Sequence, residues 1–475
     1  MSDLRRYSPP GCLSVAQLLE ATGGSLVAGP DQGEWSLCTD TRELSDGALF
    51  VALIGENHDG HRFVPGALSA HSCGALVARA SLDGLDMPAE LRGPVIAVDD
   101  TLIAFGEIAA AFLAVSAPRV AAITGSVGKT TTRAMLASVL SQSSTGLQTR
   151  GNFNNRIGLP LTLLSLRPED RWAVLEMGMS EPGELRMLAE IARPQVRVIT
   201  EVSAAHLQFF ASVEAIADAK GELFEGAQPG DVLVLPADNP LSARFPRPVG
   251  STVVRFSLNA DSDAEVKALH IEDKGIVGST ARILVHGKSL AIDVPLAGRH
   301  QVHNALAAAA AGHAMGASLS DIAAGIALCE VPGRRMKVHE VAGITVLDDA
   351  YNANPASVAA ALRTLAALPT VGRRIAALGD MLELGPTADV LHAEAGTQAA
   401  ELGLDLLVGA GPLMAHAVGA ARAAGIRAEA VLDSKGAGDV LLAQLQPGDL
   451  LLLKGSRGMK MEAALEPLAA LPGGN

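Results

Sequence analysis

The chain has 475 residues, 49% of them apolar and 19% charged, and its formal net charge is −14. Its length predicts about three domains at ~100–200 residues each. The negative charge argues against a surface for nucleic acid or an anionic membrane, and no stretch reaches the ~18 apolar residues of a spanning helix. The N-terminus lacks the apolar core of a signal peptide, so we expect a cytoplasmic protein.

Short apolar strands and helices alternate in the first part of the chain, which predicts an N-terminal α/β domain over residues 1–117. The expected strands are 48–54, 74–77 and 95–98. A helix over 101–115 should end before Pro118, because proline disfavours a helical conformation of the residue before it.

A central domain is predicted over residues 118–332. The apolar run 120–124 is typical of a buried parallel strand, and a glycine turn and a helix follow it. Strands and helices then alternate, which predicts a parallel α/β sheet. The further expected strands are 172–175, 196–200 and 232–235; the expected helices are 131–141, 184–191, 213–224 and 301–315; and 252–295 should be rich in strands.

A smaller C-terminal α/β domain of Rossmann-like type is predicted over residues 333–475, after a boundary at Pro332-Gly333. Apolar runs separated by helical patterns recur through this part of the chain. The expected strands are 344–347, 374–378, 404–408, 428–431 and 449–453.

The sharpest motif is a glycine loop between a predicted strand and a predicted helix. Glycines let the backbone turn tightly and aim several N–H groups at one point, and the helix N-terminus adds a partial positive charge. Lys129 would face the β- and γ-phosphates, and Thr130 would offer its hydroxyl to Mg²⁺. Ile123 stands where the standard pattern has glycine, so the loop is shortened. The loop, which predicts a nucleoside triphosphate site, comprises Gly125, Ser126, Val127, Gly128, Lys129, Thr130 and Thr131.

Three further polar residues are candidates for the same site. Glu176 follows a predicted strand, at the sheet edge where ligands gather, and its carboxylate suits Mg²⁺; the alternative is a solvated glutamate. By themselves His206 and Lys220 are typical of a structural histidine and a surface lysine.

In order and spacing, these residues resemble the Mur ligases. The resemblance continues through 298–306, which contains Asn304, and through 332–334, which contains Arg334. It covers nearly the whole chain. It implies an N-terminal domain for a UDP-sugar peptide, a central P-loop domain for ATP, and a C-terminal domain that closes over the nucleotide and brings the amine.

Other segments resemble the family member that adds D-alanyl-D-alanine to UDP-N-acetylmuramoyl-tripeptide. They are 348–355, 378–385 with His392, and 454–457. The D-Y-A-H-T-P and D-N-P-R segments typical of the diaminopimelate- or lysine-adding sister do not occur. Upstream, 40–42 and 151–160 resemble the parts that contact the UDP-sugar peptide.

The resemblance implies a role for each candidate. Catalysis would involve Lys129, Glu176, His206, Lys220 and Arg334. Two Mg²⁺ ions would be held by Thr130, Glu176, His206 and a carbamoylated Lys220. Besides the loop, ATP would contact Asn304, Arg334 and Asp349. The two other substrates would contact Thr41, Arg42, Asn152, Asn155, Asn352, Asn354, Asp380 and Lys454.

Two positions depart from the family pattern. Glu201 stands where many relatives carry asparagine, and Arg335 where an apolar residue is common. Two alternatives stay open: a Mur-type ligase that adds another amino acid or extends folate with glutamate, and an inactive P-loop relative that only binds ATP. The third residue of the tripeptide, diaminopimelate or lysine, is also open. Nothing in the sequence demands more than a monomer.

Overall fold

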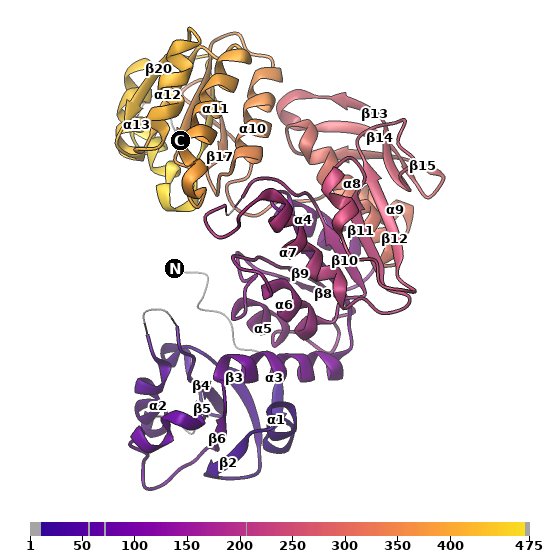
Figure 1. The fold of residues 1–475 in the computed structure, drawn as a ribbon, viewed down its shortest axis with the longest axis vertical. Helices are drawn as coiled ribbons and strands as arrows, with labels where there is room; N and C mark the ends of the chain where they lie inside the picture. Colours follow the sequence, from indigo (N-terminus) through magenta and orange to yellow (C-terminus); the bar gives the residue numbers. More distant parts are fainter. Residues whose placement is uncertain (1–10, 56–57, 71–72, 206, 471–475) are drawn as a thin grey trace. The chain divides into compact units, whose positions relative to one another are not determined.

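The structure is a computed structural model, and it describes residues 11–55, 58–70, 73–205 and 207–470. It contains three sheets with helices between their strands, so the predicted α/β class is confirmed (Figure 1). No helix among the described residues is long and apolar enough to cross a membrane. The chain forms two compact units: the first is Met1–Ala122, Ser143–Met179 and Gly183–Gln195, and the second is Ile123–Gln142, Ser180–Pro182 and Val196–Asn475.

The first sheet lies in the first unit, with strand order β1-β3-β4-β5-β6-β2. Neighbours from β3 to β6 are parallel, and β1 and β2 are antiparallel edge strands. The predicted strands 74–77 and 95–98 are confirmed, and the predicted strand 48–54 is shorter and ends at Val51. Strands β1, β2 and β3 were not predicted because they are short and partly exposed. The elements are β1 Cys12–Ser14, α1 Val15–Thr22, β2 Ser25–Ala28, β3 Glu34–Cys38, β4 Ala48–Val51, α2 Val64–Ala70, β5 Gly74–Ala78, β6 Val95–Val98 and α3 Thr101–Ser116.

The second sheet has the order β15-β14-β13-β12-β11-β10-β7-β9-β8. Strands β10 to β13 pair in parallel, and β13 to β15 form an antiparallel meander, which is the predicted strand-rich excursion. The strands are β7 Arg119–Thr124, β8 Gly146–Gln148, β9 Trp172–Glu176, β10 Val196–Ile199, β11 Val232–Pro236, β12 Thr252–Ser257, β13 Val266–Asp273, β14 Ser279–Val285 and β15 Lys288–Val294. The helices are α4 Lys129–Leu140, α5 Gly158–Leu163, α6 Glu184–Ala192, α7 Val213–Glu225, α8 Arg299–Ala314 and α9 Leu319–Ala327.

Alanine accounts for the close packing of α8 in the second unit. The run 305–311 contains six alanines and one leucine, and all seven residues are buried. The helix packs against β10 to β14 and against α4. Small side chains let its backbone approach the sheet closely, so the alanine content of this segment reflects packing in a protein core.

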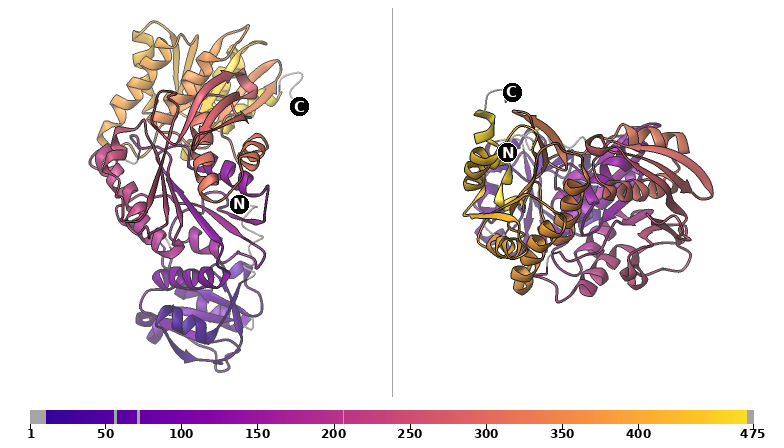
Figure 2. Two further views of the ribbon diagram at one scale, coloured as in Figure 1. Left: turned by 90° about the vertical axis from the view of Figure 1, so that its right-hand side faces the viewer. Right: turned by 90° about the horizontal axis from the view of Figure 1, so that it is seen from above.

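The third sheet has the order β16-β17-β21-β18-β19-β20. Its pairs are parallel except for the edge strand β16. One core joins the sheet to α10, α11 and α12, and a second core joins the opposite face to α13. Figure 2 shows this part of the chain, in orange and yellow, from two further directions. The elements are β16 Lys337–Val341, β17 Ile344–Asp349, α10 Pro355–Ala367, β18 Arg374–Gly379, α11 Ala388–Glu401, β19 Leu406–Ala410, α12 Met414–Ala423, β20 Arg427–Val431, α13 Ser434–Gln444 and β21 Leu450–Lys454.

Candidate nucleotide and substrate site

The glycine loop joins the end of β7 to the start of α4, as predicted. Gly125 has a φ of +152°, and a Cβ there would lie 2.0 Å from Oγ1 of Thr200. Gly128 has a φ of +86°, and a Cβ there would lie 2.3 Å from Oδ1 of Asn304. Both positions therefore require glycine. The second contact also places the predicted nucleotide ligand Asn304 directly against the loop.

The segment after β10 holds the loop from the side. The Ser126 N–H donates to the carbonyl of Glu201 at 2.8 Å, and its hydroxyl exchanges hydrogen bonds with the backbone of Ser203. The Thr200 hydroxyl donates to the Val127 carbonyl at 2.5 Å. Sequence reasoning named neither Thr200 nor Ser203; the signal was their place directly after a parallel strand, where ligand-site residues gather.

Glu201, the first departure from the family pattern, is tied to its own surroundings. Its carboxylate accepts hydrogen bonds from the Val202 N–H at 2.9 Å and from the side-chain amide of Asn239. Nε2 of His303 lies 3.9 Å from the same carboxylate. The extra charge is therefore engaged by three neighbours beside the loop.

Two lysines of the predicted set lie in the second unit. Lys129 donates from Nζ to the Gly125 carbonyl at 2.7 Å, within its own loop. Lys220, on α7, is only 2% exposed. Burial first, and then the positive charge of Lys129, hold the pKa of Lys220 well below its usual value. An ammonium ion in this place would be costly, so the amine is favoured in its uncharged form.

The predicted magnesium ligands are of mixed kinds. Thr130 is buried in the first turn of α4. His206 lies outside the described residues, and Glu176 belongs to the first unit. Among the residues that the structure describes, no group of three or more histidine, cysteine, aspartate or glutamate side chains could hold a metal. The Thr130 hydroxyl and a carbamoylated Lys220 are not among these four residue types. The proposed Mg²⁺ site therefore stays a prediction.

Glu176 ends β9 in the first unit, as predicted, and is buried. Its N–H donates to Oγ1 of Thr149, and its carboxylate accepts from Nδ2 of Asn154, both at 2.9 Å. The backbone carbonyl of Asn154 in turn accepts the Gly178 N–H. Sequence reasoning selected the neighbours of Asn154 in this asparagine-rich loop and missed the residue that orients Glu176.

The other predicted substrate contacts of the first unit lie in turns. Thr41 and Arg42 belong to a short 3₁₀ helix, and Arg42 makes an ion pair of 2.5 Å with Asp40. Asn152 is exposed, and Asn155 accepts the N–H groups of residues 157 and 158 at the start of α5. Their roles toward a substrate stay predictions.

Three predicted residues meet where β17 and β21 end in the second unit. Nζ of Lys454 lies 2.5 Å from the carboxylate of Asp349 and donates to the Asn352 carbonyl at 2.9 Å. Lys454 is buried, so this ion pair holds a charge that would be costly alone. The same pair engages the carboxylate of Asp349, which the family resemblance assigns to ATP.

Arg334 is anchored to the start of the same segment. Nη1 lies 2.5 Å from the carboxylate of the fully buried Asp348, and its carbonyl accepts the Tyr351 N–H. Asp348 was not among the predicted site residues, although the Asp-Asp pair at a strand end was the signal for it. Arg335, the second departure, stacks its guanidinium 3.8 Å from the Tyr351 ring centre and donates to the Pro332 carbonyl.

Two buried side chains fix the segment 379–383. The carboxylate of Asp380 accepts the Met414 N–H at the start of α12 at 2.8 Å. Nε2 of His392 accepts the Met381 N–H at 2.9 Å, and Nδ1 lies 2.6 Å from the Ala388 carbonyl, which fixes the proton on Nδ1. Burial, the largest cause, lowers the pKa of His392.

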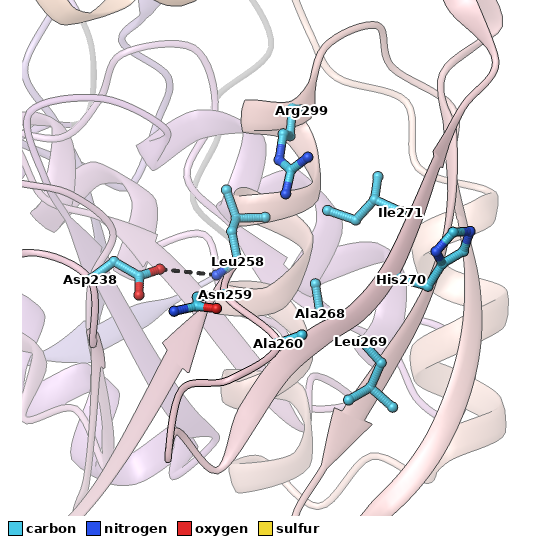
Figure 3. A pocket seen from close by; sticks show the side chains of 9 residues that line it. All are labelled: Asp238, Leu258, Asn259, Ala260, Ala268, Leu269, His270, Ile271 and Arg299. Atoms are coloured by element: carbon cyan, nitrogen blue, oxygen red, sulfur yellow. Dashed lines mark hydrogen bonds between the residues drawn. The ribbon is translucent and has the colours of Figure 1, made fainter.

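A pocket of about 540 Å³ lies where β11 and β12 end, between these strand ends, β13 and the start of α8 (Figure 3). The carboxylate of Asp238 accepts the Ser257 hydroxyl at 2.7 Å and the Leu258 N–H at 3.0 Å. Arg299 reaches the pocket from the first turn of α8. The pocket opens at the carboxyl edge of parallel strands, the edge that also carries the glycine loop. Sequence reasoning did not identify it.

Known families and structures match this chain over most of its length. The model of the Mur ligase middle domain matches residues 123–312, and that of the Mur ligase glutamate ligase domain matches 334–457. The UDP-N-acetylmuramoyl-tripeptide–D-alanyl-D-alanine ligase of Escherichia coli (strain K12) is 38% identical, over 96% of this chain and 98% of its own length. The enzyme of that name from Bacillus subtilis (strain 168) is 35% identical, over 92% and 93%.

Solved structures agree. MurF from Acinetobacter baumannii superposes with a TM-score of 0.87 and 32% identity, covering 97% of this chain and 99% of that one. MurF ligase from Thermotoga maritima in complex with ADP gives 0.77 and 25%, covering 91% and 96%. With matched models for its middle and C-terminal parts and relatives of this identity over nearly its full length, the chain belongs to the Mur ligase family.

Proposed function

We propose that this chain is an ATP-dependent, ADP-forming ligase that joins D-alanyl-D-alanine to UDP-N-acetylmuramoyl-tripeptide, which yields the pentapeptide precursor of peptidoglycan. One observation carries the proposal: relatives with this activity in their names are 35–38% identical over almost the whole chain. The ADP bound in the Thermotoga maritima structure supports ATP as the nucleotide. The glycine loop with Lys129 supplies the matching phosphate site.

The reaction proceeds in two steps. The terminal carboxylate of the tripeptide attacks the γ-phosphorus of ATP, and the bond to the β–γ bridging oxygen breaks to release ADP and leave an acyl phosphate. The amine of D-alanyl-D-alanine then attacks the acyl carbon, loses a proton, and displaces phosphate. Two anions must meet in the first step, so the main task of the site is electrostatic. Lys129 and the N-terminus of α4 provide positive charge there.

Two Mg²⁺ ions fit the donor set that the family implies. Bound magnesium would neutralise phosphate charge and bring the carboxylate toward it. Thr130 and Glu176 would hold one ion, and His206 and a carbamoylated Lys220 the other. The buried Lys220 amine supports this assignment, because an uncharged amine adds to CO₂ and loses a proton to give a carbamate. The carbamate is an oxygen donor, which Mg²⁺ prefers.

The remaining assignments complete the proposal. Residues 1–117, with Thr41 and Arg42, would bind the UDP-sugar peptide, helped by Asn152 and Asn155. Residues 118–332 would bind ATP, with Asn304 next to the loop. Residues 333–475 would bring Arg334 and Asp349 to the nucleotide and bind the dipeptide, and the chain would act as a monomer. The dipeptide candidates are Asn352, Asn354, Asp380 and Lys454.

The test measures phosphate release with ATP, Mg²⁺, UDP-N-acetylmuramoyl-tripeptide and D-alanyl-D-alanine, with each component omitted in turn and the product weighed by mass spectrometry. We expect release only with all four components, and a product heavier than the tripeptide by one dipeptide residue. Faster reaction with another amine would favour a different Mur-type ligase. Nucleotide binding without turnover would favour an inactive relative.

A further inference from the structure

Asn354 links the segment 348–355 to the phosphate loop. It caps α10: its Oδ1 accepts the Ser357 N–H at 2.9 Å, and its own N–H donates to the Ser357 hydroxyl at 3.0 Å. Its side-chain amide points elsewhere, with Nδ2 donating to the Ser126 carbonyl at 3.2 Å. One side chain therefore fixes a helix start and contacts a loop 228 positions away in sequence.

The contact completes the hydrogen bonding of Ser126. The N–H and hydroxyl of Ser126 are held by Glu201 and Ser203, and Asn354 holds its carbonyl. Because a trans peptide group is planar, fixing the Ser126 carbonyl also fixes the direction of the Val127 N–H on its opposite side. Thr200 holds the next carbonyl, that of Val127. N–H groups of such a loop are the donors that bind phosphate.

A second contact joins the segment 378–385 to Gln208, in the stretch between β10 and α7. The Gln208 N–H donates to the Glu383 carbonyl at 3.0 Å. Glu383 has a φ of +65°, and a Cβ on Gly385 would lie 3.1 Å from Cα of Gln208. Two of the segments that resemble the D-alanyl-D-alanine-adding enzyme thus contact distant loops: 348–355 contacts the glycine loop at Ser126, and 378–385 contacts Gln208.

From these contacts we infer that Asn354, a dipeptide candidate by the family resemblance, acts instead as a positioning residue for the phosphate loop, through the Ser126 carbonyl. The inference rests on the proposed function, because it assigns nucleotide binding to the loop. Coupling between two sites is reciprocal. The contact with Asn354 favours the nucleotide-binding form of the loop. Bound nucleotide therefore also stabilises the contact between the loop and the segment 348–355.

The variant Asn354→Ser tests this inference. Serine keeps an oxygen that caps α10 but removes the amide that reaches Ser126. We expect the dissociation constant for ADP with Mg²⁺, measured by isothermal titration calorimetry, to rise about three- to tenfold, the effect of one neutral hydrogen bond. The KM for D-alanyl-D-alanine at saturating ATP should stay within about twofold of the wild-type value if no dipeptide contact is lost.

Ser357→Ala is the matched control. It removes the two hydrogen bonds that the Ser357 hydroxyl makes with the Asn354 backbone, and it leaves the Asn354 amide in place. This variant should lower the melting temperature and leave ADP affinity unchanged. Equal loss of ADP affinity in both variants would assign the effect to the helix cap and overturn the inference.

Two further outcomes would also overturn it: a raised KM for the dipeptide with unchanged ADP affinity in Asn354→Ser, or no change in either. These are distinct from failure of the proposed function. If the wild-type chain binds ADP but forms no amide, the proposed function fails while the ADP titration still decides the role of Asn354. If the wild-type chain binds no ADP, both fail together.

Discussion

The proposed Mg²⁺ site depends on carbamate formation at the buried amine of Lys220. Burial and the charge of Lys129 lower the pKa of Lys220 and so favour the uncharged amine, the form that carbamate formation requires; protonation of the amine removes the nucleophile. We expect Lys220→Ala to lose about 10–100-fold in kcat, the cost that removal of a supporting group at a metal site commonly has. Acetate, another carboxylate, should restore part of the activity. Phosphate release at the wild-type rate in Lys220→Ala would contradict the carbamate assignment.

Gly128 offers a second test at a single residue. Alanine there would place its Cβ 2.3 Å from Oδ1 of Asn304 at a φ of +86°. We expect Gly128→Ala to weaken ADP binding at least tenfold in a calorimetric titration, because the loop and Asn304 must separate. Gly183→Ala is a matched control: its φ is +90° but its Cβ would meet nothing within 4 Å. The control should cost stability, ~1–2 kcal/mol for the left-handed backbone, and retain ADP affinity.

Single residues also mark where sequence reasoning reached its limit. The glycine loop was predictable because strand, glycines, lysine and helix follow one another in the chain. Asn154 was not, since three asparagines occupy 152, 154 and 155 and only the fold decides which one meets Glu176. The pairing of Arg334 with Asp348 likewise joins residues 14 positions apart, and local pattern does not report it.

At the scale of elements, His392 on α11 determines the conformation of the segment after β18. Its neutral ring accepts the Met381 N–H, and a proton on Nε2 would turn that acceptor into a donor. Because burial lowers the pKa of His392, the unfolded chain takes up its proton first as the pH falls. Stability from this group is thus complete above the unfolded pKa of about 6.5 and is lost below it.

The prediction is that His392→Ala lowers the free energy of unfolding by about 1–3 kcal/mol at pH 7.5, because a buried N–H loses its partner, and that it reduces the loss of stability between pH 7 and pH 5. Urea unfolding at both pH values measures this. Val390→Ala, a change of an exposed side chain without a titratable group on the same helix, is the control and should leave the pH dependence near that of the wild type. An unchanged slope in His392→Ala would exclude the histidine as its source.

Elements with continuous apolar runs were predictable from sequence, and edge elements were not. The strand Val95–Val98 has the bounds that its four buried residues suggest. In contrast, β16 reads Lys-Val-His-Glu-Val and is partly exposed, so its strand character comes from pairing with β17. The predicted strand 404–408 begins two residues later, because the Leu404 N–H closes the end of α11 by donating to the Ala399 carbonyl.

For the molecule as a whole, the family resemblance predicted more than local patterns could. Alternating elements indicated only an α/β architecture, whereas motifs spread from residue 40 to residue 457 indicated the Mur ligases. The contacts that join distant motifs, such as Asn354 with Ser126, depend on how the elements fold together. The division at residues 117 and 332 stays a prediction.

Magnesium should control the whole reaction. Because the proposed site holds two ions, we expect phosphate release to depend on free Mg²⁺ more steeply than first order at low concentration, and to stop when EDTA removes the metal.

A ligand that binds only the folded chain stabilises it, by about 2.7 kcal/mol at 100 times its dissociation constant. ADP with Mg²⁺ should therefore raise the melting temperature, and EDTA should reverse most of that rise because Thr130 would then contact no ion. Calcium-loaded protein is the control for general charge screening: it should recover part of the thermal shift but little phosphate release, since Ca²⁺ prefers longer and more flexible coordination than Mg²⁺. Full phosphate release in EDTA would exclude the metal-assisted mechanism and leave Lys129 and the loop as the phosphate site.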